Sequence, residues 1–331
     1  MTETVQTRVP RRRDLALVDN LERLRDAIIG SPMNHGLHLI GDRWSLSVIR
    51  AAFLGARQFE QFRQQLDIPK QTLSQRLKEM VRLGILATLP YQTNPVRLDY
   101  RLTDKGRALY PNVLMSWAWE RKWNSDTSAL PARLTHKSCR KRFLPQCVCA
   151  ACHMPASLHD MEAVLSLDPV MAPLPPRSRR WSGKLPDHAD HGATDAAGNR
   201  LLAFGLTVDR WSLLVICALY LGCHRFDQLQ YVLSVGSSVL ANRLAMLCDT
   251  GLLLRQPDLQ DGRRFIYRLT PASHDLFHHV VTMSRWVSEQ HYGTGSTVSM
   301  VHRDCGHEFV PDVVCDQCGE VLHARDVKFD Y

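Results

Sequence analysis

The chain has 331 residues, of which 45% are apolar, and its Lys and Arg exceed its Asp and Glu by 41 to 33. This length corresponds to about two domains, and the apolar content is sufficient for sizeable cores, which excludes a disordered or fibrous protein. A net charge of +8 favours polyanionic partners such as nucleic acid or anionic lipid.

The apolar segments are too short to cross a membrane. The longest near-continuous apolar run, residues 213–223, has 11 residues, whereas a spanning helix needs about 20. The arginines near the N-terminus are followed by acidic residues and not by the apolar core of a signal peptide. We therefore expect a cytoplasmic protein without a membrane span. In that reducing compartment, the ten cysteines are expected to be metal ligands, buried thiols or redox sensors, in preference to structural disulfides.

The second half of the chain repeats the first. The segment DRWSLSVI, which begins at Asp42, returns as DRWSLLVI at Asp209, an offset of 167 residues. The same offset relates the segment YRLT at Tyr100 to the one at Tyr267, and it continues to Trp119 and Trp286. Chance does not maintain one offset over so long a stretch, so the chain is a tandem duplication.

After Trp119 the offset becomes 166, and it then aligns Cys139 with Cys305 and Cys152 with Cys318. Each half is therefore predicted to consist of a larger domain followed by a small cysteine-containing module. Residues 166–198 hold five prolines and no helical or strand periodicity, which indicates a semi-rigid linker. The predicted divisions are an N-terminal arm and helix (1–30), a first large domain (31–124), a first small module (133–165), the linker (166–198), a second large domain (199–292) and a second small module (298–331).

In the first large domain, the apolar spacing predicts three helices, a hairpin and a last helix. Residues 44–54 and 59–66 each place apolar residues on one helical face. Residues 71–83 form the third predicted helix, which ends at Gly84. Residues 85–89 and 96–102 flank a polar tip and are expected to pair as two strands, and the last helix is expected from 103 or 104 to about 122. This order is that of a winged helix-turn-helix, a mainly helical fold with a small β wing.

The outer face of the third predicted helix has the chemistry of a DNA-reading surface. Its side chains are hydrogen-bonding types beside cations, which suit base edges and phosphates in a major groove. Each of these residues could instead be an ordinary solvated side chain, and their position on the third helix favours the DNA-binding interpretation. The predicted contacts are Gln71, Thr72, Ser74, Gln75, Arg76, Lys78 and Arg82, with Arg97 near the hairpin tip.

Four segments carry a resemblance to a known family. They are LIGDRWSLSVIR (39–50), RQFEQFRQQL (57–66), IPKQTLSQRLKEMVRLGIL (68–86) and YQTNPVRLDYRLTDKGRALYP (91–111). The sequence resembles the HxlR-type transcriptional regulators, relatives of the MarR group, over residues 31–123 and more loosely over 200–286. The resemblance implies a winged-helix fold that binds double-stranded DNA and regulates transcription, usually as a dimer joined through terminal helices.

The two halves differ in charge. Residues 32–123 contain 14 Lys and Arg against 7 Asp and Glu, whereas residues 200–292 contain 9 against 7. We therefore expect the first half to supply most of the DNA affinity, and the second to act as a built-in dimer partner and weaker reader. The Asp261-Gly262 turn favours a tight hairpin that exposes the two following arginines. The predicted contacts in the second half are Ser237, Ser238, Asn242, Arg243, Arg263 and Arg264.

Both small modules have the spacing of a metal site. Each contains His-x2-Cys-x9-Cys-x2-Cys, which provides three thiolates and one imidazole for tetrahedral Zn²⁺. Because four ligands leave no open position and a module of about 30 residues has little core, we expect one structural zinc in each module. His307 is an alternative to His302 as the fourth ligand. The predicted ligands are His136, Cys139, Cys149 and Cys152 in the first module and His302, Cys305, Cys315 and Cys318 in the second.

Catalysis is not expected, because the sequence has no P-loop, no Gly-x-Ser-x-Gly elbow and no dinucleotide-binding fingerprint. The preferred interpretation is a tandem winged-helix transcriptional regulator with a zinc-ribbon-like module after each winged helix. Two alternatives stay open: an adaptor that binds other proteins of the transcription apparatus, and a redox- or metal-responsive regulator that acts through its cysteine clusters. The sequence does not identify the operator, a small-molecule effector, the sign of regulation or whether whole chains form a homodimer.

Overall fold

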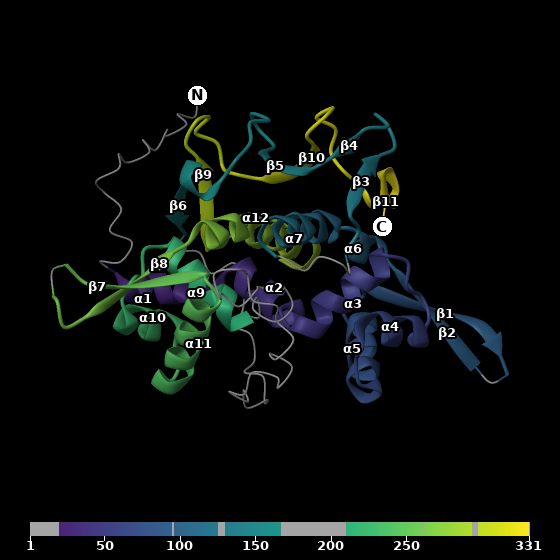
Figure 1. Ribbon diagram of the computed structural model, residues 1–331, viewed down its shortest axis with the longest axis horizontal. Coiled ribbons are helices and arrows are strands. Elements are labelled where there is room, and N and C mark those ends of the chain that lie inside the picture. Colours follow the sequence, from purple (N-terminus) through teal and green to yellow (C-terminus); the bar gives the residue numbers. More distant parts are fainter. Residues whose placement is uncertain are drawn as a thin grey trace, which may run out of the picture.

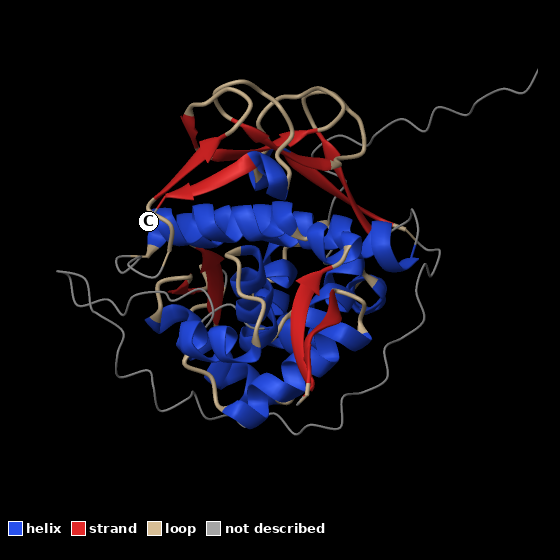
Figure 2. Ribbon diagram, turned by 90° about the vertical axis from the view of Figure 1, so that its right-hand side faces the viewer, coloured by secondary structure: helices blue, strands red, loops and turns tan. Residues whose placement is uncertain are grey.

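The computed structural model describes residues 20–94, 96–124, 130–166, 210–259, 261–292 and 297–330. The described residues form three layers (Figures 1 and 2). Two winged-helix units make up the lower layer, two long helices cross the middle, and short strands from both halves form the upper layer. The predicted linker falls almost entirely outside the described residues.

The first winged helix follows the predicted order of elements. Its three helices are α3 (Arg43–Phe53), α4 (Phe59–Leu66) and α5 (Lys70–Arg82), and its wing pairs β1 (Leu86–Thr93) with β2 (Val96–Leu102). The Asp42 side chain begins α3 by accepting hydrogen bonds from the backbone N–H groups of Trp44 and Ser45, at 3.2 Å each. Gly84 follows α5 with φ +69°, a left-handed backbone conformation that is strained for residues with a side chain.

Two features of the first half differ from the expectation. The predicted last helix is divided into α6 (Asp104–Arg107) and α7 (Tyr110–Trp123), with Pro111 in the first turn of α7, where its missing N–H is tolerated. The N-terminal part contributes two helices, α1 (Leu21–Gly30) and α2 (Pro32–Ile40), of which only the first was expected. The Ser31 side chain begins α2 by accepting a hydrogen bond from the Asn34 N–H.

The second winged helix repeats the same order. It consists of α9 (Arg210–Tyr220), α10 (Phe226–Leu233), α11 (Ser237–Asp249) and the wing strands β7 (Leu253–Pro257) and β8 (Phe265–Leu269). Its last helix, α12 (Pro271–Val287), is followed by a short π-helix, Ser288–Tyr292. In the described residues no single helix is long and apolar enough to cross a membrane, although α10 and α11 would pass by length and composition as a pair bent by 118°.

The middle layer joins the halves through reciprocal contacts of α6 and α7 with α12. The Trp119 indole donates a hydrogen bond to the Ala272 carbonyl at 2.8 Å, and the Trp286 indole donates one to the Lys105 carbonyl at 2.9 Å. The offset of 167 residues relates Trp119 to Trp286 and Lys105 to Ala272, so these are one contact made twice in opposite directions. Such reciprocity defines a two-fold interface between like subunits, here formed within one chain.

An unlike pair breaks this symmetry at the centre of the interface. Asn112 and His279 are equivalent in the repeat, and the Asn112 amide lies 3.1 Å from His279 Nδ1 and 2.8 Å from its carbonyl oxygen. Ser116 Oγ lies 2.9 Å from the same ring nitrogen. His279 is only 1% exposed, and this burial lowers its pKa to about 3.

This histidine predicts an acid sensitivity of folding. Below its ordinary pKa of about 6.5, the unfolded chain protonates His279 whereas the folded chain does not, so folding stability falls as the pH falls from about 6.5 toward 3. Denaturant unfolding measures this effect between pH 6.5 and 5.5. Over this range the free energy of unfolding of the parent chain should fall by up to about 1.4 kcal/mol per pH unit more than that of His279→Asn. If the free energy of unfolding has the same pH dependence in the parent chain and in His279→Asn, then His279 is not held in its neutral form by burial.

The upper layer combines strands from both small modules. The pairs are β5 (Pro145–Cys149) with β10 (Pro311–Cys315), β3 (Arg133–His136) with β11 (Val327–Asp330), and β6 (Met161–Leu165) with β9 (Val298–His302), and β4 (Arg142–Phe143) extends β3. Among the described strands of this layer, every pair except β3 with β4 takes one strand from each half. The expectation of two separate zinc-ribbon-like modules is therefore corrected to one shared layer. A second apolar core, which includes Tyr110, Phe277 and Phe309, lies beneath it.

Candidate DNA-binding face and metal centres

The two third helices, α5 and α11, lie on the face opposite the strand layer (Figure 1). In α5, Leu73, Leu77 and Met80 are buried against the core, while Gln71, Gln75, Lys78 and Arg82 are exposed and Thr72 and Ser74 are half-buried. In α11, Ser237, Ser238 and Asn242 are exposed opposite a buried leucine face. The helical periodicity therefore placed these polar side chains on the outer surface correctly.

Two predicted contacts occupy structural positions instead. Arg243 is 7% exposed, and its guanidinium lies 3.3 Å from the Met246 sulfur. Its equivalent, Arg76, has a side chain that is 16% exposed and forms an ion pair with Asp42 at 3.1 Å. Asp42 also caps α3, so this pair joins α5 to the start of α3. Both arginines are largely buried within their winged helix, and their assignment as DNA contacts stays a prediction.

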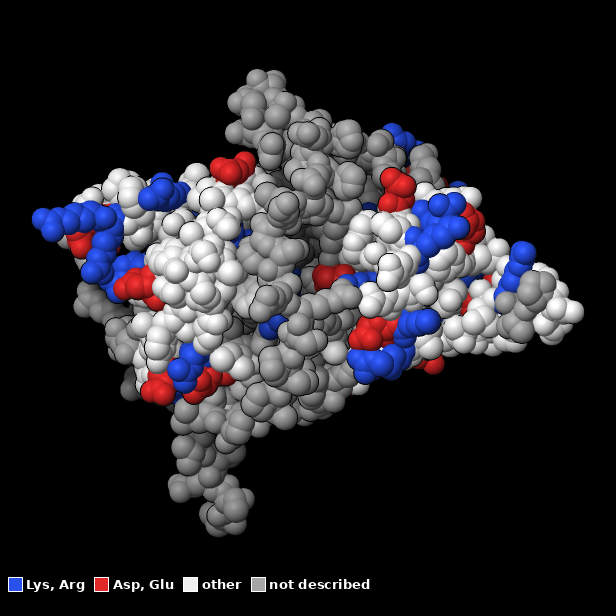
Figure 3. All heavy atoms as spheres, turned by 90° about the horizontal axis from the view of Figure 1, so that it is seen from below, with Lys and Arg blue, Asp and Glu red and all other residues white. Residues whose placement is uncertain are grey.

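Cations also lie at the wings. Arg97, Arg263 and Arg264 are exposed. The Arg264 N–H donates to the Asp261 carbonyl at 2.8 Å, which closes the predicted tight turn and leaves the Arg263 side chain exposed. Seen from below, Lys and Arg are visible on both sides of the molecule, with Asp and Glu among them (Figure 3).

The repeat shows how the third helices differ in charge. Lys78 of α5 corresponds to Ala245 of α11, and Arg82 corresponds to Asp249. Arg82 is partly neutralised because it forms an ion pair with Glu79 at 2.7 Å. Lys78 is exposed on α5 and Ala245 is exposed at the matching place on α11. Part of the charge difference predicted from composition therefore lies on the outer surface of the third helices.

The eight predicted metal ligands form two clusters, and their grouping differs from the expectation. In each cluster one atom from each of four residues lies within 4.8 Å of the others, so both could hold a metal ion. The first, called the His136 centre, contains His136, Cys139, Cys315 and Cys318. The second, called the His302 centre, contains Cys149, Cys152, His302 and Cys305. Each centre therefore takes one ligand pair from each half, which corrects the prediction of one site per module.

This exchange follows from the strand pairing. In the antiparallel pair of β5 and β10, Cys149 lies opposite Pro311 and Cys315 lies opposite Pro145. Cys149 and Cys315 therefore lie at opposite ends of this two-stranded sheet, and each lies close to the His-x2-Cys pair of the other half. His307 is exposed and is not in either cluster, so the structure favours His302 as the histidine of its centre.

The ligand geometry fits a tetrahedral metal ion bound by sulfur and nitrogen. Zinc with bonds of about 2.3 Å to sulfur and 2.05 Å to nitrogen requires about 3.8 Å between two sulfurs and about 3.5 Å between sulfur and nitrogen. The sulfur pairs Cys139–Cys315 and Cys149–Cys305 are 4.0 and 3.9 Å apart. The sulfur to Nδ1 distances are 3.3 to 3.5 Å in both centres. Both centres therefore have the size of a four-coordinate site.

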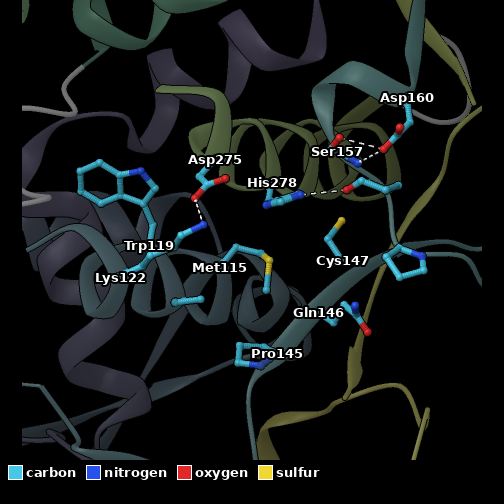
Figure 4. Close-up of a pocket in the computed structure, with 13 residues that line it drawn as sticks. Met115, Trp119, Lys122, Pro145, Gln146, Cys147, Ser157, Asp160, Asp275 and His278 are labelled. Carbon is cyan, nitrogen blue, oxygen red and sulfur yellow. Dashed lines mark hydrogen bonds and ion pairs between the residues drawn. The ribbon is translucent and has the colours of Figure 1, made fainter. Parts of the chain in front are cut away.

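Cys147, the thiol with no counterpart in the second module, lines a cavity of about 330 Å³ between α7, α12 and β5 (Figure 4). Burial raises the pKa of its thiol to about 12, so it stays protonated. The polar groups around it already have partners: Lys122 pairs with Asp275 at 2.7 Å, and His278 lies 2.9 Å from the Ala156 carbonyl. These residues have the character of a packed interface, and Cys147 is a buried thiol.

Comparisons with known proteins agree with the winged-helix fold. The profile of the HxlR-like helix-turn-helix family matches residues 39–128 and 206–293, which together are more than half of the chain. An uncharacterized HTH-type transcriptional regulator of Mycobacterium tuberculosis is 36% identical over 123 residues, which are 37% of this chain and 78% of the relative. The uncharacterized HTH-type transcriptional regulator YdeP of Bacillus subtilis is 29% identical over 108 residues, 32% of this chain and 84% of the relative.

Two solved structures also match part of the chain. A Pseudomonas aeruginosa protein described as a transcription factor, PA1374, is 28% identical, covers 34% of this chain and 75% of its own, and has a TM-score of 0.25. PA1607, described in the same way, is 27% identical, covers 44% of this chain and 89% of its own, and has a TM-score of 0.30. With both halves matched by the family profile, the chain belongs to the HxlR-like helix-turn-helix family as a tandem duplication.

Proposed function

We propose that the protein is a sequence-specific, DNA-binding regulator of transcription in which one chain supplies both winged helices. The observation that carries this proposal is the reciprocal contact of α6 and α7 with α12, which joins two winged-helix units as an internal pseudo-dimer. The third helices of both units lie on one face (Figure 1). In such an arrangement two third helices can enter successive turns of the major groove, about 34 Å apart. This role places the protein in the cytoplasm.

The proposed DNA contacts are unequal between the halves. In the first half the exposed side chains combine amides, which suit base edges, with Lys78 and Arg97, which suit phosphates. In the second half, short hydroxyl and amide groups on α11 and the wing arginines form a weaker reader. Because the halves differ, the preferred operator is asymmetric. The proposed contacts are Gln71, Thr72, Ser74, Gln75, Lys78, Arg82, Arg97, Ser237, Ser238, Asn242, Arg263 and Arg264.

We further propose that both centres hold structural zinc. Three cysteine sulfurs and one histidine nitrogen form a donor set that zinc prefers, and the distances above match its tetrahedral geometry. Bound zinc would supply a four-coordinate cross-link with no open position, which fits a structural role and not a catalytic one. Since each centre joins two halves, the zinc would hold the shared strand layer together.

Selection of genomic DNA tests the DNA-binding role. The purified, metal-analysed protein is incubated with fragmented DNA from its source genome at about 150 mM salt, where non-specific binding is suppressed, and the retained fragments are sequenced. We expect a few promoter fragments to be enriched. A folded, metal-loaded chain that retains no particular fragment would overturn the proposal in favour of an adaptor that binds proteins.

A further inference from the structure

The two metal centres are equivalent in the repeat, but their histidines have different surroundings. In both centres Nδ1 faces the sulfurs, at 3.3 and 3.5 Å for His136 and 3.4 Å for His302. The other ring nitrogen, Nε2, points away from the cluster. In a metal site, the partner of that second nitrogen fixes the orientation of the ring and increases its basicity.

In the His136 centre a carboxylate lies at ion-pair distance from that nitrogen. Glu320 Oε2 lies 3.8 Å from His136 Nε2. The offset of 166 residues, which aligns the ligands of the two modules, places Met154 where Glu320 stands. Among the described residues His302 Nε2 is buried and has no hydrogen-bond partner. The His302 nitrogen is therefore buried without a hydrogen-bond partner, whereas the His136 nitrogen has a carboxylate at ion-pair distance.

We propose that the His302 centre is an exchangeable zinc site and that its occupancy regulates DNA binding, whereas the His136 centre retains its metal. Loss of a partner to a metal-bound histidine typically weakens metal affinity by about 10 to 100 times. The ligand is a zinc ion, and we attribute the inequality to the carboxylate of Glu320, which Met154 replaces beside the His302 centre. The regulatory part of this inference rests on the proposed DNA-binding function.

A chain of contacts links the His302 centre to the second winged helix. His302 ends β9, which pairs with β6. The ends of this pair are joined to α1: Thr297, the residue before β9, donates to the Ala27 carbonyl at 2.7 Å, and Arg23 donates to the carbonyl of Leu165 in β6 at 3.1 Å. In turn, α1 packs on α10. Loss of zinc from this centre would therefore loosen α1 and, with it, the support of α10, which lies beneath α1 (Figure 1).

Stepwise zinc removal tests the inequality directly. The two-zinc protein is mixed with excess chromophoric chelator, and released zinc is counted against time. We expect one equivalent to leave at least about 10 times faster than the other. Met154→Glu should slow the fast phase toward the slow one, Glu320→Met should make both phases fast, and Met154→Leu is the matched control that leaves the fast phase unchanged. Release of two equivalents in one phase, or a fast phase unaffected by Met154→Glu, would overturn the proposal.

Binding to the selected operator tests the regulatory part. Protein from which only the fast equivalent has been withdrawn should bind about tenfold more weakly than two-zinc protein, as expected for the loss of one or two groove contacts. In Met154→Glu, the same chelator treatment should leave affinity unchanged. Equal affinity with one and two zinc ions overturns the regulatory role. If the two-zinc protein selects no DNA, the proposed function fails, and the release experiment still decides whether the centres are unequal.

Discussion

Replacing Cys139 and Cys149 together with serine is expected to remove both metal ions, whereas replacing Cys139 and Cys315 together removes only one. The first pair damages both centres, because Cys139 belongs to the His136 centre and Cys149 to the His302 centre. The second pair damages the His136 centre alone. If each metal site lay within one module, the Cys139/Cys149 pair would remove one ion and the Cys139/Cys315 pair would remove both. Elemental analysis after dialysis against a weak chelator measures the difference, and Cys147→Ala is the control that keeps two ions.

The stability of the two variants should follow the metal count. Structural zinc contributes about 10–16 kcal/mol in small zinc-dependent peptides. Here the winged helices have a large apolar core of their own, so we expect loss of the strand layer while the helices persist. Limited proteolysis should then cut residues 130–166 and 297–330 in the Cys139/Cys149 variant, and leave the Cys147→Ala chain intact. Protection of these residues in a metal-free chain would show that strand pairing alone holds the layer.

The elements of the winged helices could be predicted because their signals are local. Apolar spacing gives the bounds of α4 and places α5 within one residue, and Gly84 marks the end of that helix. The start of α2 also has a local signal, Ser31 followed by Pro32, which combines an N-cap with a proline in the first turn. Local patterns therefore account for the helices, including one that was missed.

The pairing of metal ligands could not be predicted in this way. Both modules have identical spacing, so each His-x2-Cys pair matches either Cys-x2-Cys pair equally well. The choice depends on β5 pairing with β10 across the two halves, which is a long-range contact. In the same way, helical periodicity placed Arg76 near the outer face of α5, but its ion pair with Asp42 depends on how α5 packs against the start of α3. What the sequence left undetermined are contacts between distant segments.

Exchanging one residue between the third helices should move DNA affinity in opposite directions. Lys78 on α5 and Ala245 on α11 occupy equivalent, exposed positions. If Lys78 contacts a phosphate, Lys78→Ala removes one counterion-releasing contact and lowers the slope of log affinity against log salt by about 1. Affinity should fall by a similar factor for operator and unrelated DNA. Titrations of both DNAs at several salt concentrations measure this change.

The converse variant, Ala245→Lys, tests whether the second winged helix touches DNA. A lysine there should raise the salt slope by about 1 if α11 lies against the backbone, and leave it unchanged if α11 is clear of the duplex. The matched control is Gln71→Ala on α5, which removes a base-reading group: it should lower affinity for the operator by about 1–3 kcal/mol, relax sequence preference and leave the slope unchanged. If Lys78→Ala changes the salt slope and Ala245→Lys does not, the proposal that both third helices contact DNA is overturned. The first winged helix then remains the DNA-binding unit.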